Sequence, residues 1–105
     1  MITIINLTPH AIVEITTSTT YQPSGVICRV DQTSTKIGEI NSTPIFAVEY
    51  GSVEGLPEPK EDIIYLVSSL VLAALKGTRT DVYAPGDLIR DEKGQPIGCK
   101  GFKVG

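Results

Sequence analysis

Two serines and two arginines of this sequence have the chemistry to hold a phosphate group. Ser68 and Ser69 stand where an apolar run gives way to helix-forming residues, and the first N–H groups of a helix are free to bind an anion. Arg79 and Arg90 follow in the chain, and a guanidinium group can bind two phosphate oxygens at once. If the fold brings either arginine to the start of the helix, these side chains form a site for a nucleotide phosphate.

A simpler interpretation accounts for the same residues without a ligand. Ser68 can cap the helix, which by itself contributes about 1 kcal/mol. Surface ion pairs can occupy the arginines, Arg79 with Asp81 and Arg90 with Asp91. The sequence alone leaves both interpretations open.

Two tyrosines and the only histidine extend the predicted binding set. Tyr50 and Tyr83 each stand beside a glycine-containing turn, where an aromatic ring can line a pocket and stack on a base. His10 follows Thr8 and Pro9 in a predicted turn, so it is either a ligand contact or a surface imidazole that caps the turn. The ligand-binding residues predicted from the sequence are Thr8, His10, Tyr50, Ser68, Ser69, Arg79, Tyr83 and Arg90.

The sequence predicts no catalytic residue, no metal site and no cofactor. A single histidine rules out metal sites that need two within one chain, and no known glycine-rich phosphate loop occurs. Cys28 and Cys99 lack the flanking residues of a known cysteine nucleophile, although a couple of either with His10 stays open. We expect both cysteines to be buried thiols in a reducing compartment.

Short segments rich in isoleucine, valine and threonine predict strands in the first half of the chain. Residues 1–6 and 11–17 should pair as a hairpin, with Pro9 at its turn. Further strands are expected at 25–30, with Cys28 facing inward, at 36–40, and at 44–50, where Gly51 ends the strand.

The second half of the chain carries the stronger signals. Residues 51–62, rich in glycine and proline, predict a surface loop. Residues 63–67 are continuously apolar, which is typical of a central strand covered on both faces. Residues 68–76 predict the one helix, with serines at its start and Lys76-Gly77 at its end. Residues 81–87 lead through a turn into a strand at 88–90, and this strand and residues 96–102 predict a hairpin around the turn at 91–95.

These elements predict an α+β fold over a single domain, residues 1–105. We expect a small, mainly antiparallel β-sheet or open barrel of about seven short strands with one helix at roughly 68–76. The single strand-to-helix unit argues against a doubly wound parallel sheet. A compact domain of this length has a radius of gyration of about 13 Å. Because so small a domain buries a modest share of its surface, we also expect a homo-oligomer.

The composition of the chain indicates where the protein is located and which partners it does not bind. The chain is 41% apolar and 20% charged, as folded proteins are, and its net charge of −3 argues against binding to duplex nucleic acid. The longest apolar run, residues 63–75, is too short to span a membrane, and the amino terminus does not have the pattern of a signal peptide. We therefore expect a soluble, cytoplasmic protein without membrane contact.

Residues 6–12, NLTPHAI, resemble the opening of a family of small bacterial and phage proteins with no established activity. The likeness continues over nearly the whole chain, at residues 50–57, 64–68 and 85–91, at Gly94 and at 97–99. It implies a bacterial or phage origin, with the host cytoplasm as the location if a phage encodes the chain, and it transfers no catalytic residue.

Elimination and this implied origin lead to two hypotheses of different classes. The first is a non-enzymatic protein that binds and sequesters a small phosphorylated, nucleotide-derived signalling molecule between subunits, as an anti-defence sponge. The alternative is a protein–protein interaction module or accessory factor, without a small-molecule ligand, whose exposed strand edge or Pro57-containing loop contacts a larger partner. A third, weaker hypothesis is an enzyme that uses His10, Asp81 or Asp87 on a nucleotide.

Overall fold

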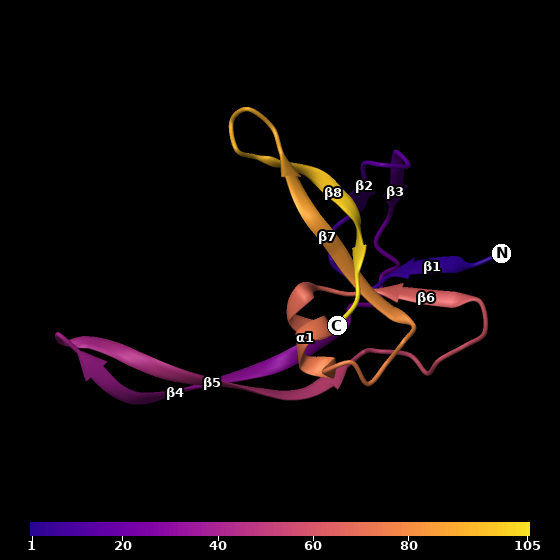
Figure 1. Cartoon of the computed structure of the whole chain (residues 1–105). Helices are drawn as coiled ribbons and strands as arrows, with labels where there is room; N and C mark the ends of the chain where they lie inside the picture. The colour runs from indigo at the N-terminus through magenta and orange to yellow at the C-terminus, as the bar shows by residue number, and fades with distance from the viewer.

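The computed structural model describes residues 1–105 and contains eight strands and one short helix. Two long hairpins project from a small body in different directions (Figure 1). In chain order the elements are β1 (Thr3–Asn6), β2 (Ile12–Glu14), β3 (Thr19–Tyr21), β4 (Arg29–Ile40), β5 (Thr43–Glu54), β6 (Ile63–Leu66), α1 (Ser69–Leu75), β7 (Val82–Arg90) and β8 (Pro96–Lys103).

The body is a six-stranded mixed sheet in the order β1-β6-β7-β8-β2-β3. Pairing is parallel for β1 with β6, β6 with β7 and β2 with β8, and antiparallel for β7 with β8 and β2 with β3. A bridge between Asn6 and Pro23 brings the two ends of the sheet together, so the sheet is nearly closed. The expectation of a small β-rich fold with one helix is confirmed, whereas "mainly antiparallel" and "about seven strands" are corrected to a mixed sheet and eight strands.

Strand β6 lies inside the sheet and is covered on both faces, as its apolar run predicts. Tyr65 and Val67 belong to the main hydrophobic cluster, which includes Val71 and Leu72 of the helix. Leu66 points to the other face and packs in a second cluster. Side chains alternate between the faces of a strand, so a strand between two clusters has to be apolar at every position.

The helix α1 forms where the sequence predicts it. Its N-cap is Ser68, whose Oγ accepts a hydrogen bond from Val71 N at 3.3 Å, and Lys76 ends it in a left-handed conformation. The helix links the parallel strands β6 and β7 and packs Val71 and Leu72 against the sheet. Its seven residues are neither long nor apolar enough to cross a membrane.

The predicted hairpin of residues 1–6 and 11–17 is wrong. Strand β1 pairs in parallel with β6, and β2 pairs with β3, a strand that the sequence analysis missed. The buried side chain of Asn6 explains the change of direction, because its Nδ2 donates to the carbonyls of His10 at 2.8 Å and Tyr21 at 2.9 Å. These bonds hold the 7–11 loop away from a hairpin path and place β3 next to it.

Strands β4 and β5 form a separate two-stranded ribbon, which we call the arm (Figure 1). The predicted strand at 25–30 starts only at Arg29, and β5 runs past Gly51 to Glu54. The turn of the arm consists of Asn41 and Ser42, which both have positive φ, as in a two-residue hairpin turn. The predicted strand at 36–40 is only the end of the much longer β4, most of which is polar, because the exposed strand of a ribbon needs no apolar residues.

The arm also changes the shape of the molecule. The radius of gyration is 16.2 Å and the principal extents are 53 × 40 × 22 Å, so the expected compact value of about 13 Å is wrong. In Figure 1 the arm extends to one side of the body and the β7–β8 hairpin extends upward from it. The carboxyl terminus lies beside α1, where Gly105 approaches Leu72.

Candidate functional site

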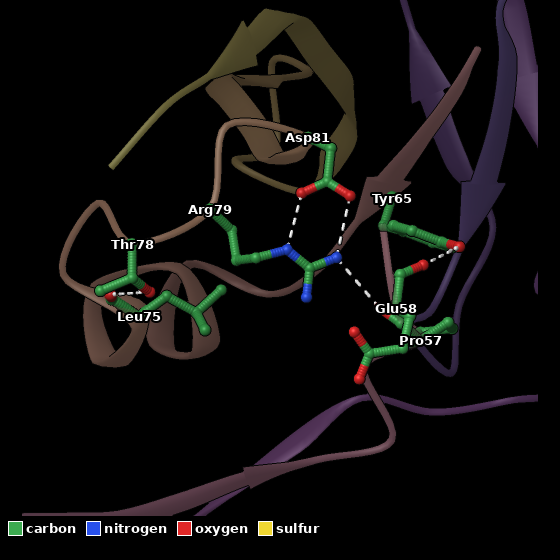
Figure 2. Close-up of polar contacts among 7 residues, drawn as sticks. All are labelled: Pro57, Glu58, Tyr65, Leu75, Thr78, Arg79 and Asp81. Atoms are coloured by element: carbon green, nitrogen blue, oxygen red, sulfur yellow. Dashed lines mark hydrogen bonds and ion pairs between the residues drawn. The ribbon is translucent and has the colours of Figure 1, made fainter. Parts of the chain in front are cut away.

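Arg79 takes part in an ion pair that connects two parts of the body. Its Nε and Nη2 donate to the two carboxylate oxygens of Asp81, each at 2.8 Å, and Nη2 also donates to the carbonyl of Pro57 at 3.0 Å (Figure 2). The Arg79 side chain is only 19% exposed. The guanidinium group therefore ties the loop after β5 to the start of β7.

This ion pair keeps both partners charged. Hydrogen bonds to Asp81 raise the pKa of Arg79 above its ordinary value. Hydrogen bonds from Arg79 lower the pKa of Asp81 below its ordinary value, against the effect of burial. The geometry around Arg79 is thus the one that the ligand-free interpretation of the sequence describes.

Arg90 lies far from Arg79, near the tip of the β7–β8 hairpin. Its Nη1 donates to the carbonyl of Gly94 at 2.8 Å and closes the turn. The predicted ion pair with Asp91 does not form, because Asp91 Oδ1 accepts the N–H groups of Lys93 and Gln95, both at 2.9 Å. An aspartate at the start of a turn commonly bonds to backbone N–H groups in this way.

Neither Arg79 nor Arg90 contacts the start of the helix. Ser68 and Arg79 lie beyond opposite ends of α1, which at seven residues is about 10 Å long. Arg79 precedes β7, and Arg90 ends it. The structure therefore does not bring the two arginines and the two serines together.

Four of the eight predicted residues lie in the segments that follow the neighbouring parallel strands β1 and β6, and Tyr83 lies near the start of β7, opposite Leu66. Hydrogen bonds from Leu7 N to Leu66 O at 2.8 Å and from Val67 N to Tyr83 O at 2.9 Å join the segments of these three strands. Ligands of open α/β sheets bind at the edge where parallel strands end. The predicted residues that follow β1 and β6 at this edge are Thr8, His10, Ser68 and Ser69.

Several of these side chains already have structural roles. Ser68 Oγ caps the helix, and Thr8 Oγ1 donates to Asn6 Oδ1 at 2.7 Å. Tyr83 is half-buried against the second cluster. Ser69 and His10 are exposed and make no side-chain hydrogen bond. This edge therefore offers an open imidazole and a hydroxyl but no arginine.

Cys28 and Cys99 are buried, unpaired thiols in different clusters. Burial raises the pKa of each above its ordinary value, so both stay protonated near neutral pH. No group of three or more histidine, cysteine, aspartate or glutamate side chains lies close enough together to hold a metal ion.

An apolar row of exposed side chains runs along the arm. Lys36, Ser34 and Gln32 of β4 lie opposite Phe46, Val48 and Tyr50 of β5, and directly opposed residues share a face. Phe46 is 54% exposed, Val48 45% and Tyr50 46%. We call this side the apolar face of the arm; it consists of Gln32, Ser34, Lys36, Glu39, Pro44, Phe46, Val48 and Tyr50.

The apolar face continues into the hydrophobic core. At the base of the arm, the paired Val30 and Val53 pack against the main cluster. The register shift between Val30 and Gln32 inserts one extra residue in β5, which returns Val53 to the face that carries Tyr50. A row of apolar side chains of β5 thus extends from the core to Phe46. The main cluster covers this row only at the base of the arm, and the side chains from Tyr50 to Phe46 are exposed.

A groove of about 810 Å³ lies where this face meets the end of the helix. Residues 48–53 of β5, with Val48, Tyr50 and Val53 among them, line one side of it, and Ala74, Leu75, Lys76 and Thr78 line the other. Tyr50, which was predicted as a pocket-lining residue for a base, does line this groove, but none of the other seven predicted residues does.

Phe46 and Val48 were not among the residues predicted to be functional, although the sequence contains a signal for them. Ile45, Ala47 and Glu49 alternate with Phe46, Val48 and Tyr50. In a strand the last three residues therefore share one face, which is apolar throughout. What the pattern does not reveal is that this face has no layer packed on it.

The chain matches no family model, and no curated protein or solved structure is significantly similar to it. The resemblance of residues 6–12 to small bacterial and phage proteins therefore rests on those residues and the shorter stretches noted with them.

Proposed function

We propose that the chain is a non-catalytic protein–protein interaction module that binds a protein through the apolar face of the arm. The observation that carries this proposal is the row of Phe46, Val48 and Tyr50, about half exposed and continuous with the core. Exposed apolar surface of this kind on a folded chain commonly marks a protein contact. This is the alternative hypothesis of the sequence analysis, with the arm in place of the Pro57 loop as the contact.

The groove beside the arm supports the same proposal. Protein interfaces are built around aromatic and aliphatic side chains that enter pockets on the partner. Here the apolar row and the groove beside it lie on one side of the molecule, so one partner can engage both. The Pro57 loop is less suited to such a contact, because the Pro57 carbonyl is already bonded to Arg79.

Two variants on opposite faces of the arm test the proposal. Val48→Asp places a charge on the apolar face, and Thr35→Asp places the same charge one position away on the other face. Tagged wild-type chain, captured from the cells that produce it, should retain a stoichiometric protein partner, either another protein or an untagged copy of the chain. The Thr35→Asp variant should retain this partner and Val48→Asp should lose it. If both variants retain the partner, or if the wild type has none, the proposal is wrong.

A second candidate, the binding of a small phosphorylated molecule, is favoured by one observation. Thr8 and Ser69 follow the neighbouring parallel strands β1 and β6, and the exposed His10 lies in the loop just after Thr8. Ligand sites are common at the carboxyl ends of parallel strands. Thermal shift measurements against cyclic dinucleotides and ADP-ribose derivatives test it, with His10→Ala as the variant. No stabilisation by any of these ligands would exclude a sponge for them.

A further inference from the structure

We infer that the protein covering the apolar face of the arm is a second copy of this chain, so that two arms pack face to face about a twofold axis. This inference rests on the proposed function, because it names the partner of the same surface. Three features lead to it: the area that the whole chain leaves exposed, the distribution of charge on the arm, and the weakness of an isolated ribbon.

The chain exposes more surface than a compact monomer of its mass does. Its accessible area is 7223 Å², whereas a monomer of 11.3 kDa exposes about 5,700 Å². The excess of about 1,500 Å² exceeds the roughly 800 Å² that each partner buries in a standard interface. Only 13 of the 105 residues are buried, so the monomer has a small core, and its exposed surface is large enough for a stable dimer interface.

Charge on the apolar face suits a second copy of the same face. The only charged residues there are Lys36 and Glu39, and they form an ion pair with each other at 2.5 Å. The face is therefore electrically neutral and does not repel its own copy. The opposite face carries Asp31, Glu49 and, at the base of the arm, the paired Arg29 and Glu54, so its net charge is negative and two copies of that face would repel one another.

The arm is also too thin to be stable alone. Every residue from 31 to 44 is exposed, so most of β4 contacts only β5. An isolated two-stranded hairpin is marginally stable in water, and a layer packed on its apolar face is what stabilises it. Two identical ribbons can supply that layer to each other, because in a twofold interface each surface contacts its own copy.

Sedimentation equilibrium of the purified full-length chain over a wide range of concentrations tests the inference. The wild type should sediment as a dimer. Val48→Asp should weaken association about 100-fold or more, because a twofold interface would bury the new charge twice. Phe46→Ala should weaken association about tenfold by removing apolar contact area, and the matched control Thr35→Asp should leave it unchanged.

The outcomes separate the inference from the proposed function. A dimeric wild type that becomes monomeric in Val48→Asp but not in Thr35→Asp supports both, provided that circular dichroism shows all variants folded alike. A wild type that stays monomeric at every concentration overturns the inference, and the proposed function then survives only if a different protein is captured through Val48. A dimer that is indifferent to Val48→Asp and Phe46→Ala uses another surface and also overturns the inference.

Discussion

Two buried polar side chains, Asn6 and Glu14, hold the irregular parts of the body together. Asn6 connects the loop after β1 to β3, as described above. The carboxylate of Glu14 accepts hydrogen bonds from the hydroxyl and N–H groups of Thr16 and Thr17, and from Gly101 N at 2.7 Å. It therefore fixes the β2–β3 turn and attaches it to β8, which is distant in sequence.

Glu14 should make stability depend on pH in the acid range. Hydrogen bonds from the Thr16 hydroxyl and from Gly101 N lower the pKa of Glu14 from 4.5 to about 2. A group whose pKa is lower in the folded chain stabilises the fold above its unfolded pKa, and this stabilisation is lost as pH falls from 4.5 towards 2. Glu14→Gln should lower the thermal midpoint at pH 7, and the difference from wild type should shrink towards pH 2. A difference that stays constant with pH would contradict this role.

The ion pair of Arg79 is expected to stabilise the fold. Arg79→Ala removes hydrogen bonds to a carboxylate and leaves Asp81 unpaired, so unfolding free energy should drop by about 1.5 to 3 kcal/mol. Arg90→Ala is the matched control, since Arg90 is exposed and bonds only to Gly94; its effect should stay within about 0.5 kcal/mol. Urea denaturation measures both, and a double-mutant cycle with Asp81→Ala isolates the pair. Equal effects of the two arginine variants would contradict the distinction.

At the scale of elements, the helix is held by one face only. Leu72 is 6% exposed and packs in the main cluster, whereas Leu70 is 40% exposed. Leu72→Ala should therefore cost about 2 to 5 kcal/mol, and Leu70→Ala no more than about 0.5 kcal/mol. Chemical denaturation of the two variants provides the comparison. A large loss in Leu70→Ala would mean that a partner or a different packing covers that side of the helix.

The β7–β8 hairpin depends on a close approach of its two backbones at Gly86. A Cβ atom at this position would lie 2.4 Å from the carbonyl oxygen of Lys100 and 2.9 Å from that of Gly101. Gly86→Ala should therefore shift the backbone and cost about 1 to 3 kcal/mol. Gly38→Ala, in the open strand β4 with no atom near the added methyl group, should be nearly neutral. Similar thermal midpoints for the two variants would contradict this account.

At the scale of the whole molecule, the body and the distal arm should be separable. The main cluster receives Val30 and Val53 from the base of the arm but no residue beyond them. Replacing residues 34–48 by Asn-Gly joins Thr33 to Glu49, which are already paired across the ribbon. The shortened chain should keep the far-UV spectrum of a folded body and sediment as a monomer. Loss of the folded body would mean that the distal arm is part of its core.

The sequence determined the elements whose signals are local. The helix has its capping serine, its apolar face and its Lys76-Gly77 end within ten residues, and the hairpin of β7 and β8 has Asp91 and Gly94 at its turn. The apolar run of β6 was sufficient to identify a strand covered on both faces. In each case the interactions that decide the structure lie between residues close in the chain or on one strand.

Only the tertiary structure decided which strands pair and which surfaces stay open. β1 was expected to pair with its neighbour in sequence, but the bonds of the Asn6 side chain to His10 and Tyr21 direct the chain elsewhere. Arg79 could have faced a ligand, and its place beside Asp81 and Pro57 depends on where two loops meet. The row of Phe46, Val48 and Tyr50 reads in sequence as a buried strand face. Whether such a face is covered depends on what packs against it, and no local pattern of residues contains that information.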